Sequence, residues 1–372
     1  MIMRMKVLLW LALAFASAAQ AQTPTLKDAV EQAWIRSQQA DLQAARRAEL
    51  DARQRVTGAW FPDSPTVGLD VRRDQPRWSE PFGMQQGPER GKNEWEPALA
   101  VPLWLPGQRA AQRRVIDEDR EAATARAAAD RLALAGEVRE ALWAAHRGRQ
   151  NVALAQARLQ AADALEADVA RRLRAGELAR TDLLLAQSEL LTARAALAQA
   201  HASERGTMDA YDALVGLRIL PPPEPEPPTR DAFDANPALQ AQMDAIAAAR
   251  ARLDYAQTVR RDSPTFAIVP RFDRDVGGGD YRNSVRVGIA IPLDTDVRNA
   301  PRIAAASTAL AEAQIAAVAT RRQLMIQVAQ ARAALESAEA QAAIATTQQR
   351  VALENLDLIE RAFRYGERGL VD

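Results

Sequence analysis

The chain has 372 residues, which is enough for two ordinary domains or for one unusually elongated domain. Lys plus Arg and Asp plus Glu both number 48, so the formal net charge is zero, which argues against a strongly basic nucleic-acid surface. The absence of cysteine excludes disulfides, thiolate metal sites and a lipidated N-terminal cysteine. Aromatic residues make up only 5% of the chain, and its long stretches of Ala, Arg, Gln, Glu and Leu are typical of long helices.

Residues 1–21 have the pattern of a secretory signal peptide. Arg4 and Lys6 precede an apolar run at 7–15, and the Ala-x-Ala pattern at 19–21 follows, so we expect cleavage after Ala21. A retained membrane anchor is the alternative, but the run is short for a spanning helix. No later stretch approaches the roughly 20 apolar residues that such a helix needs. A membrane location would therefore depend on strands.

Residues 22–217 are predicted to form a helix, a β-hairpin and a long helical hairpin. The first helix is expected at about 26–59, with Thr25 and Asp28 resembling a capping box. Alternating apolar residues predict strands at about 66–72 and 98–103. A helix that begins near Gly107 and runs for about sixty residues would be about 90 Å long. It is expected to reverse direction at a tip near 174–182.

A heptad seam runs along both arms of this helical hairpin, because apolar or small residues are spaced alternately by four and three. The first arm carries Leu134, Val138, Ala141, Ala145, Gly148, Val152, Ala155, Leu159, Ala162, Glu166, Val169 and Leu173. The second arm carries Leu183, Ala186, Leu190, Ala193, Leu197 and Ala200. Many of these positions are Ala or Gly, which allows two long helices to approach closely, and only Glu166 interrupts the seam of the first arm.

An internal repeat predicts that residues 231–372 form a second unit of the same kind. DSPT occurs at 63–66 and 262–265, VPL at 101–103 is matched by IPL at 291–293, and LRAGE at 173–177 by FRYGE at 363–367. Strands are expected at about 265–272 and 284–293, and GGG at 277–279 is interpreted as the turn between them. The long helix would begin near Ala300.

The heptad register recurs in this second unit at Leu324, Val328, Ala331, Leu335, Ala338, Ala342, Ala345, Gln349, Ala352, Leu356, Ile359 and Phe363. Nothing in the sequence corresponds to the returning helix at 183–217, so the second unit is expected to be C-terminally incomplete. The Pro-rich stretch at 218–230 is predicted to be a stiff linker, because each proline ring fixes φ and removes a backbone donor. A Pro-rich ligand for a binding module is the alternative.

The order of these elements resembles the TolC family of outer-membrane efflux proteins over essentially the whole chain after residue 21. The motifs that carry the resemblance are VPLWLPGQR at 101–109, GELARTDLL at 176–184 and GERGLVD at 366–372. The resemblance implies a mainly α fold with a small β part, in which three subunits form an α-barrel and a 12-stranded β-barrel with four strands from each. It also implies an outer-membrane location with a periplasmic helical tunnel.

The function implied by the resemblance is that of an outer-membrane channel subunit of a tripartite efflux system. Such a homotrimer would be a passive exit duct for small molecules or metal ions, driven by an inner-membrane pump through a periplasmic adaptor protein. Its further partner would be outer-membrane lipid, with no nucleic acid. A periplasmic adaptor and a structural coiled-coil envelope protein are the alternative classes. The duplicated order of strands and then helices argues against the adaptor, and a structural coiled-coil protein would not need four apolar-faced strands.

Candidate site residues belong to the tips and to the ends of the first β-hairpin. The tip residues that could meet an adaptor or form the periplasmic entrance are Gly176, Glu177, Asp182, Gly366, Glu367 and Asp372. A purely structural role in the turn is the alternative. Trp60 and Trp104 could anchor at the level of the lipid headgroups or could simply pack at a helix–strand junction.

No catalytic or cofactor-binding constellation is found in the sequence. The two histidines, His146 and His201, lie on opposite arms of the hairpin without a neighbour at ligand spacing. Nucleotide-binding and nucleophile-elbow motifs do not occur. We therefore expect no enzyme activity, no metal site and no cofactor.

Overall fold

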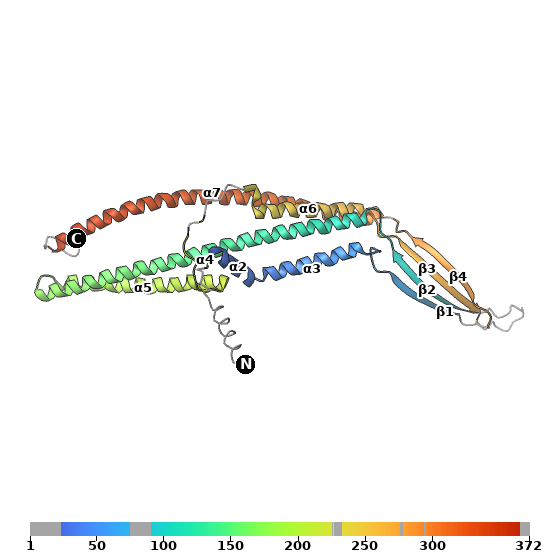
Figure 1. Cartoon of the computed structure of the whole chain (residues 1–372), viewed down its shortest axis with the longest axis horizontal. Helices are drawn as coiled ribbons and strands as arrows, with labels where there is room; N and C mark the ends of the chain where they lie inside the picture. The colour runs from blue at the N-terminus through green and yellow to red at the C-terminus, as the bar shows by residue number, and fades with distance from the viewer. Residues whose placement is uncertain are drawn as a thin grey trace, which may run out of the picture. The chain divides into compact units, whose positions relative to one another are not determined.

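The computed structural model describes residues 24–74, 91–224, 226, 233–275, 278–293 and 295–364. Within them the chain is mainly helical, with one four-stranded sheet (Figure 1). The chain divides into two units that are each built from separated segments. The first comprises 1–42, 130–231 and 325–372, and the second comprises 43–129 and 232–324. The predicted signal peptide lies outside the described residues.

The predicted helix at 26–59 is in fact two helices, α2 (Leu26–Arg36) and α3 (Gln39–Gly58). The chain bends at Gln38, whose φ of 56° lies in the left-handed region that residues other than glycine seldom adopt. Helix periodicity continues through this point, so the bend could not be found from the pattern. It lets α2 bury Ala29 and Ala33 in the core of the first unit.

A complete capping box stabilises the start of α2. Thr25 is the N-cap residue, its hydroxyl oxygen accepts from the backbone N–H of Asp28, and the Asp28 carboxylate accepts from the backbone N–H of Thr25. The Asp28 carboxylate accepts hydrogen bonds from the backbone N–H of Thr25 at 2.9 Å and from its hydroxyl at 2.8 Å, and these two bonds lower the pKa of Asp28 below its usual value. The loose match in the sequence is therefore a real cap, with aspartate in the place of the more common Glu or Gln.

The first unit is held together by the long helix α4 (Gln108–Ala175) packing against α5 (Arg180–Val215). Its core combines α2 with both helices through Ala29, Ala33, Val138, Leu142, Tyr211 and Val215. Farther toward the tip, Ala162 packs with Leu190 and Ala193. Every predicted seam position on α4 is buried or half-buried, including Glu166. The heptad pattern therefore identified the packed side of this helix correctly.

Within the second unit, α3 and α6 (Pro237–Thr258) are tied to α4 by ion pairs. Arg120 on α4 lies 2.8 Å from Asp51 on α3, and Arg252 on α6 lies 2.6 Å from Asp119 on α4. The side chain of Asp119 is only 10% exposed. Burial raises the pKa of Asp119 above its usual value, and the neighbouring charge of Arg252 opposes this rise.

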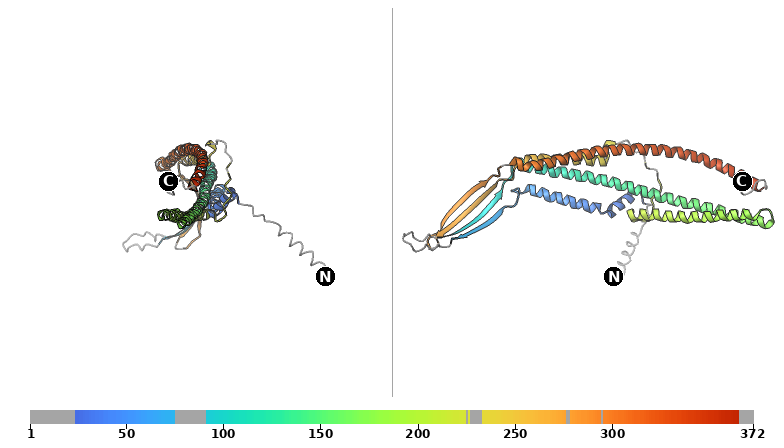
Figure 2. Two further views of the ribbon diagram at one scale, coloured as in Figure 1. Left: turned by 90° about the vertical axis from the view of Figure 1, so that its left-hand side faces the viewer. Right: turned by 180° about the vertical axis from the view of Figure 1, so that it is seen from behind.

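The sheet consists of β1 (Thr66–Arg73), β2 (Lys92–Pro102), β3 (Thr265–Asp275) and β4 (Arg282–Ala290), all antiparallel and in chain order (Figure 1, Figure 2). β2 begins at Lys92 rather than near residue 98, and β4 ends at Ala290 rather than at residue 293. The early part of β2 carries Glu94 and Glu96, whose charges hide the strand from a search for apolar alternation. Between β3 and β4, Gly278 and Gly279 have positive φ, as the turn requires.

The second long helix, α7 (Thr295–Arg364), differs from α4 in the environment of its seam. All described seam positions from Ala331 onward are exposed, with Leu335 at 60% and Leu356 at 52%. The pattern therefore predicted the apolar stripe of α7, but no described element of the chain covers that part of it.

The expectation that no later segment is apolar enough to span a membrane is wrong for α7. A window within Val297–Ile359 reaches a mean hydropathy of 1.3, to which its many alanines contribute. That stretch is 63 residues long, whereas a bilayer core needs only about 20 helical residues. Hydropathy alone therefore does not make α7 a membrane span.

Close packing at Gly148 on α4 yields a prediction about two glycines of one helix. A Cβ at Gly148 would lie 2.9 Å from Oγ1 of Thr207 and 3.2 Å from Cα of Glu204, whereas a Cβ at Gly136 would meet nothing within 4 Å. Gly148→Val should cost about 1–3 kcal/mol because α5 must move away. Gly136→Ala should stabilise by about 0.5–1 kcal/mol through helix propensity. Thermal unfolding of both variants measures these changes in stability. Equal effects of the two substitutions would contradict the close packing of α4 against α5 at Gly148.

The buried carboxylate of Asp119 yields a prediction about pH. Its pKa is raised above 3.8 in the folded chain, so the folded state binds its proton more tightly than the unfolded chain. Stability attributable to this group should therefore fall as pH rises from 3.8 through the folded pKa. At neutral pH, Arg252→Ala should cost about 1–3 kcal/mol by leaving the carboxylate without its partner.

Thermal unfolding across the acidic range compares the parent chain with these variants. Asp119→Asn should flatten the pH dependence and remove most of the additional cost of Arg252→Ala. A double variant whose loss of stability equals the sum of the losses of the two single variants would contradict the coupling between Asp119 and Arg252.

Candidate functional site

One face of the sheet is apolar and open to its surroundings. The odd-numbered side chains of β1 and β4 point to this face, and all but Arg73 and Asn283 at the strand ends are apolar: Val67, Leu69, Val71, Val285, Val287 and Ile289. Val67 is 82% exposed and Val285 is 66% exposed. Trp95 and Leu99 of β2 and Phe272 of β3 extend the same surface and are also exposed. A contiguous apolar face of this kind requires either lipid or another protein against it.

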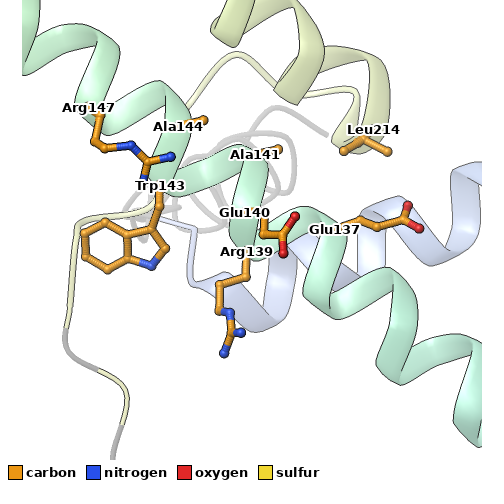
Figure 3. Close-up of a pocket in the computed structure, with 8 residues that line it drawn as sticks. All are labelled: Glu137, Arg139, Glu140, Ala141, Trp143, Ala144, Arg147 and Leu214. Carbon is orange, nitrogen blue, oxygen red and sulfur yellow. The ribbon is translucent and has the colours of Figure 1, made fainter. Parts of the chain in front are cut away.

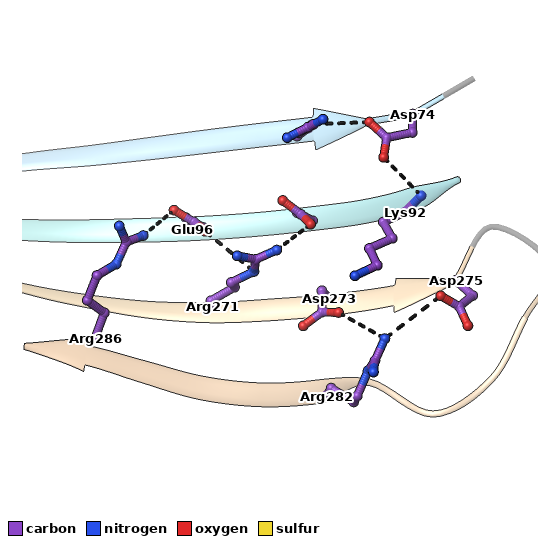
Figure 4. Close-up of polar contacts among 10 residues, drawn as sticks. Asp74, Lys92, Glu96, Arg271, Asp273, Asp275, Arg282 and Arg286 are labelled. Carbon is purple, nitrogen blue, oxygen red and sulfur yellow. Dashed lines mark hydrogen bonds and ion pairs between the residues drawn. The ribbon is translucent and has the colours of Figure 1, made fainter. Parts of the chain in front are cut away.

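The opposite face is charged in the half of the sheet that adjoins the loops (Figure 4). Arg271 of β3 forms ion pairs with Glu94 and with Glu96 of β2, the second at 3.5 Å. Glu96 also forms an ion pair with Arg286 of β4, whose guanidinium nitrogen lies 2.9 Å from the Glu96 carboxylate. These contacts join three strands on one side of the sheet.

A second cluster of ion pairs lies near the ends of the strands. Arg282 of β4 is 3.5 Å from Asp273 and 3.9 Å from Asp275 of β3, and Arg72 is 3.0 Å from Asp74 after β1 (Figure 4). Opposite charges that alternate across neighbouring strands stabilise a sheet face and keep it hydrated. Such a face is suited to water, whereas the reverse side of the same strands is not.

The charged face gives way to small residues toward the helices. Glycine and alanine occupy six positions there, beside Thr66, Pro102, Thr265 and Val269, and the six are Gly68, Ala98, Ala100, Ala267, Gly288 and Ala290. A Cβ added at Gly288 would meet nothing within 4 Å, so this half leaves open space above the strands. The sheet can therefore separate an apolar medium on one side from an aqueous space on the other.

The sequence did not single out this ion-pair network. Residue alternation alone places Arg271 and Arg286 on the polar side of their strands, but Glu94 and Glu96 lie before residue 98, where the second strand was expected to start. The available signal was the alternation of Lys92, Glu94 and Glu96 with Asn93 and Trp95, which keeps charge on one face.

At the tip between α4 and α5, Gly176 has a clear structural role. Gly176 adopts a φ of 81° and ends α4, with hydrogen bonds from its N–H to Leu173 O and from Glu177 N–H to Arg172 O. This is the Schellman pattern, which needs a residue that tolerates the left-handed conformation. The turn role of Gly176 is therefore present whether or not a partner binds there.

Asp182 and Glu177 differ in what they do at this tip. The Asp182 carboxylate accepts a hydrogen bond of 3.0 Å from the backbone N–H of Ala179, and so caps the start of α5. Glu177 is exposed, and no contact of its side chain is recorded among the described residues. The predicted positions Gly366, Glu367 and Asp372 lie outside the described residues.

The two tryptophans at the first hairpin have different environments. Trp60 is 88% exposed. Trp104 is half-buried, its indole Nε1 donates to the backbone oxygen of Ala59 at 3.4 Å, and the guanidinium of Arg109 lies 5.9 Å from its ring centroid. Trp104 therefore packs at the helix–strand junction, whereas the side chain of Trp60 is exposed.

A depression on the first unit has an accessible volume of about 720 Å³. It is lined by Glu137, Arg139, Glu140, Ala141, Trp143, Ala144, Arg147 and Leu214. Figure 3 shows the charged side chains spread along α4, so they do not form a compact constellation. Nearby, Nε2 of His146 lies 2.8 Å from the backbone oxygen of Pro221, and this contact holds the segment after α5 against α4.

A comparison with known sequences gives a match to the family model described as outer membrane efflux protein, over residues 30–216. The chain is 29% identical over 212 residues to the cobalt-zinc-cadmium resistance protein CzcC of Cupriavidus metallidurans, covering 54% of this chain and 50% of that protein. It is 32% identical over 256 residues to protein CyaE of Bordetella pertussis, covering 64% and 51%. The chain thus spans about half the length of these relatives.

Among solved structures, the CmeC outer membrane channel of Campylobacter jejuni superimposes with a TM-score of 0.72 at 12% identity, over 93% of this chain and 78% of that one. At such low identity the likeness concerns the fold. The family match covers half of this chain. The chain belongs to the outer membrane efflux protein family, whose members are outer-membrane channels and not enzymes.

Proposed function

We propose that the chain is the subunit of a homotrimeric exit duct in a tripartite efflux system. The observation that carries this proposal is the two-faced sheet, with Val67, Leu69, Val285 and Val287 exposed on one side and the ion pairs of Arg271 on the other. Lipid would cover the apolar side, and the aqueous lumen would adjoin the charged side.

The sheet geometry supports oligomerisation. Four strands cannot close into a barrel, and unpaired strand edges are not tolerated in the hydrocarbon region of a bilayer. Three copies would supply twelve strands, which is within the range of outer-membrane barrels. The strands β2 and β3 have 11 residues, β4 has 9 and β1 has 8, whereas a tilted spanning strand needs about 9–11.

The helices would form the periplasmic tunnel. In this proposal, residues 22–217 and 231–372 are two tandem repeats joined by the linker 218–230, and residues 1–21 direct export. The exposed part of the α7 seam corresponds to the α4 seam that α5 covers, so in this proposal a helix placed like α5 would cover residues such as Leu335 and Leu356. Fully burying one such leucine contributes about 1.5–3 kcal/mol.

The duct would be passive, and an inner-membrane pump would supply the energy through an adaptor protein at the tips. The sequence carries no nucleotide-binding motif. Small molecules or metal ions are the proposed cargo, and the name of CzcC, a cobalt-zinc-cadmium resistance protein, supports the inclusion of metal ions. Trp60 is proposed to lie at the lipid interface, where an exposed indole is favourable.

Two neighbouring residues of β4 test which face meets lipid. Val287→Arg places a charge on the apolar face, at a cost of about 2–4 kcal/mol in the bilayer midplane. Gly288→Arg places the same charge on the opposite face, where a Cβ has open space. We expect Val287→Arg to reduce the amount of protein in the outer-membrane fraction several-fold and Gly288→Arg to leave it unchanged.

Fractionation followed by crosslinking measures both the location and the number of subunits. A parent protein that remains a periplasmic monomer would exclude the duct. Equal tolerance of arginine at the two positions would show that the apolar face is not turned to lipid.

The tip between α4 and α5 tests the adaptor contact. Glu177→Lys changes an exposed charge that has no recorded structural contact, and Glu189→Lys makes the same change on an exposed position of α5 away from the tip. We expect Glu177→Lys to reduce resistance at least several-fold without lowering outer-membrane abundance, and Glu189→Lys to have no effect. Growth of a deletion strain carrying each variant, on cobalt, zinc and cadmium salts and on apolar drugs, measures resistance and identifies the cargo class.

A further inference from the structure

The apolar face of the sheet changes in character along the strands. We propose that its row of residues farthest from the helices, Arg73, Asn93, Arg274 and Tyr281, binds the phosphate groups of lipopolysaccharide, the phosphorylated glycolipid of the outer leaflet of the outer membrane. This inference rests on the proposed function, because it requires the apolar face to be turned to lipid. It specifies the lipid and the residues that hold it.

The strand register places these four residues side by side. Arg73 of β1 is opposite Asn93 of β2, and Asn93 is opposite Arg274 of β3. The register of β3 with β4 continues past the start of β4 to Tyr281, whose ring centroid is 5.1 Å from the guanidinium of Arg274. The row therefore crosses the whole width of the sheet on one face.

The rows nearer the helices on the same face are first aromatic and then aliphatic. The adjoining row consists of Val71, Trp95, Phe272 and Asn283, and the next two rows contain only Val, Leu, Ile and Pro. In outer-membrane barrels, girdles of aromatic residues flank the apolar band at the level where the hydrocarbon ends. The row that contains the two arginines therefore lies at the level of the lipid headgroups.

The length of the strands supports this level. The N–H of Leu103 donates to the oxygen of Pro264 at the end of the sheet near the helices, and Leu103 is ten residues from Asn93. At about 3.3 Å per residue and a strand tilt of about 35–45°, ten residues rise about 25 Å across the membrane. The apolar band of such barrels is also about 25 Å tall. Asn93 and its row thus lie at one edge of the band when Leu103 lies at the other.

The two arginines lack a counterion in the protein. Arg73 and Arg274 are the only charged residues among the strand positions of the apolar face. Both are exposed, and no ion pair of either is recorded among the described residues. By contrast, Arg72 and Arg282 on the opposite face each lie within 3.5 Å of an aspartate. A charge beside lipid that the protein does not neutralise requires an anion from its surroundings.

The spacing of the two guanidinium groups suits a phosphorylated headgroup. The backbones of β1 and β3 lie on either side of β2 and are about 9.6 Å apart, at about 4.8 Å per strand. From these positions, two long side chains can converge on one phosphate or each hold one of two. The planar guanidinium binds phosphate through two parallel N–H···O hydrogen bonds. Asn93 lies between the arginines and adds a polar amide without a charge.

A depression beside this row suits the part of the lipid next to its phosphates. It is lined by Trp95, Phe272, Tyr281 and Asn283 and has a volume of about 480 Å³. Trp95 and Tyr281 are each 49% exposed, and Phe272 is 39% exposed. Exposed aromatic rings are favourable where headgroups meet acyl chains. The arginines, the aromatic rings and the aliphatic rows therefore match the phosphates, the sugar–acyl junction and the acyl chains in order.

The direction of the sheet favours lipopolysaccharide over phospholipid. The row adjoins the segments that connect β1 with β2 and β3 with β4, whereas the helices join the sheet at its other end (Figure 1). In the proposed duct the helices are periplasmic, so the row faces the outer leaflet. That leaflet consists mainly of lipopolysaccharide, whose lipid A anchor carries phosphate groups.

Lipopolysaccharide retained during purification tests the site. The variant Arg73→Gln/Arg274→Gln removes both charges of the row. The control Arg72→Gln/Arg282→Gln removes two charges from the same end of the sheet but from the opposite face. The whole gene product is extracted from outer membranes in mild detergent, and bound lipopolysaccharide is measured per subunit. We expect the first variant to retain at least several-fold less lipopolysaccharide than the parent, and the control to retain the parental amount.

A conservative variant separates binding from folding. Arg73→Lys/Arg274→Lys keeps both charges but loses the paired hydrogen bonds of the guanidinium groups, so we expect an intermediate amount of lipopolysaccharide. Outer-membrane abundance and the fraction of oligomer are measured on the same samples. A loss of lipopolysaccharide that only follows a loss of oligomer, and that lysine does not partly restore, would contradict a role of these residues in binding.

Direct binding identifies the chemical class of the ligand. The parent protein, freed of lipid in detergent, is titrated with lipid A, with dephosphorylated lipid A and with phosphatidylglycerol, and native mass spectrometry counts the bound molecules. We expect lipid A to bind at least several-fold more tightly than the other two. This preference should be lost in Arg73→Gln/Arg274→Gln. Inorganic phosphate at the same concentration should not displace lipid A.

The outcomes distinguish the site from the proposed function. Equal retention of lipopolysaccharide by the parent and by Arg73→Gln/Arg274→Gln, in an outer-membrane oligomer, would overturn the site while leaving the duct intact. An equal loss in the control would overturn the assignment to the apolar face. Equal binding of phosphatidylglycerol, or displacement by inorganic phosphate, would overturn lipopolysaccharide as the ligand. A parent protein that fractionates as a periplasmic monomer would overturn the duct, and the site with it.

Discussion

The backbone N–H and C=O groups at the two free edges of the sheet are the constraint on which the rest of the structure depends. In water these groups would be solvated, but the apolar face of the same strands is suited to lipid, where each unsatisfied group costs several kcal/mol. A single chain of this kind cannot satisfy both requirements. The exposed valines and leucines and the open edges therefore support an assembly of several copies.

Alternation along the strands lets a single layer serve two media. Side chains of successive residues point to opposite faces, so Val285 and Val287 can face lipid while Arg286 forms an ion pair with Glu96 on the other side. The ion pairs are concentrated near the loops, and glycine and alanine occupy the same face near the helices. Charge is therefore balanced within the sheet where it is dense, and the remaining face is left open by its small side chains.

The helices meet a different constraint, which is close packing over great length. α4 has 68 residues, and it packs against α5 through alanines and glycines that allow the two backbones to approach, as at Gly148. Few large side chains are buried in this interface, so each contact contributes little and the stability must come from their number. α7 carries a similar stripe, but from Ala331 onward the described residues do not cover it. An apolar stripe of this kind is normally covered by another helix.

Periodicity in the sequence determined most of the elements and the faces that they present. The heptad spacing identified the buried side of α4, and the period of two identified β1, β3 and most of β4, because both are set by residues near one another in the chain. Thr25, Asp28 and Gly176 were found for the same reason, since a helix cap is a local structure. Membership of a family of outer-membrane channels followed from the order of these elements.

Only the tertiary structure decided the remaining features, because they depend on partners that lie far apart in the sequence. The bend at Gln38 follows from packing of α2 in the core of the first unit, and nothing in the local pattern marks it. The early start of β2 rests on Glu94, whose charge is acceptable in the sheet only because Arg271, 177 residues away, lies beside it. Sequence periodicity shows which face a residue occupies, but the strand register decides what that residue meets.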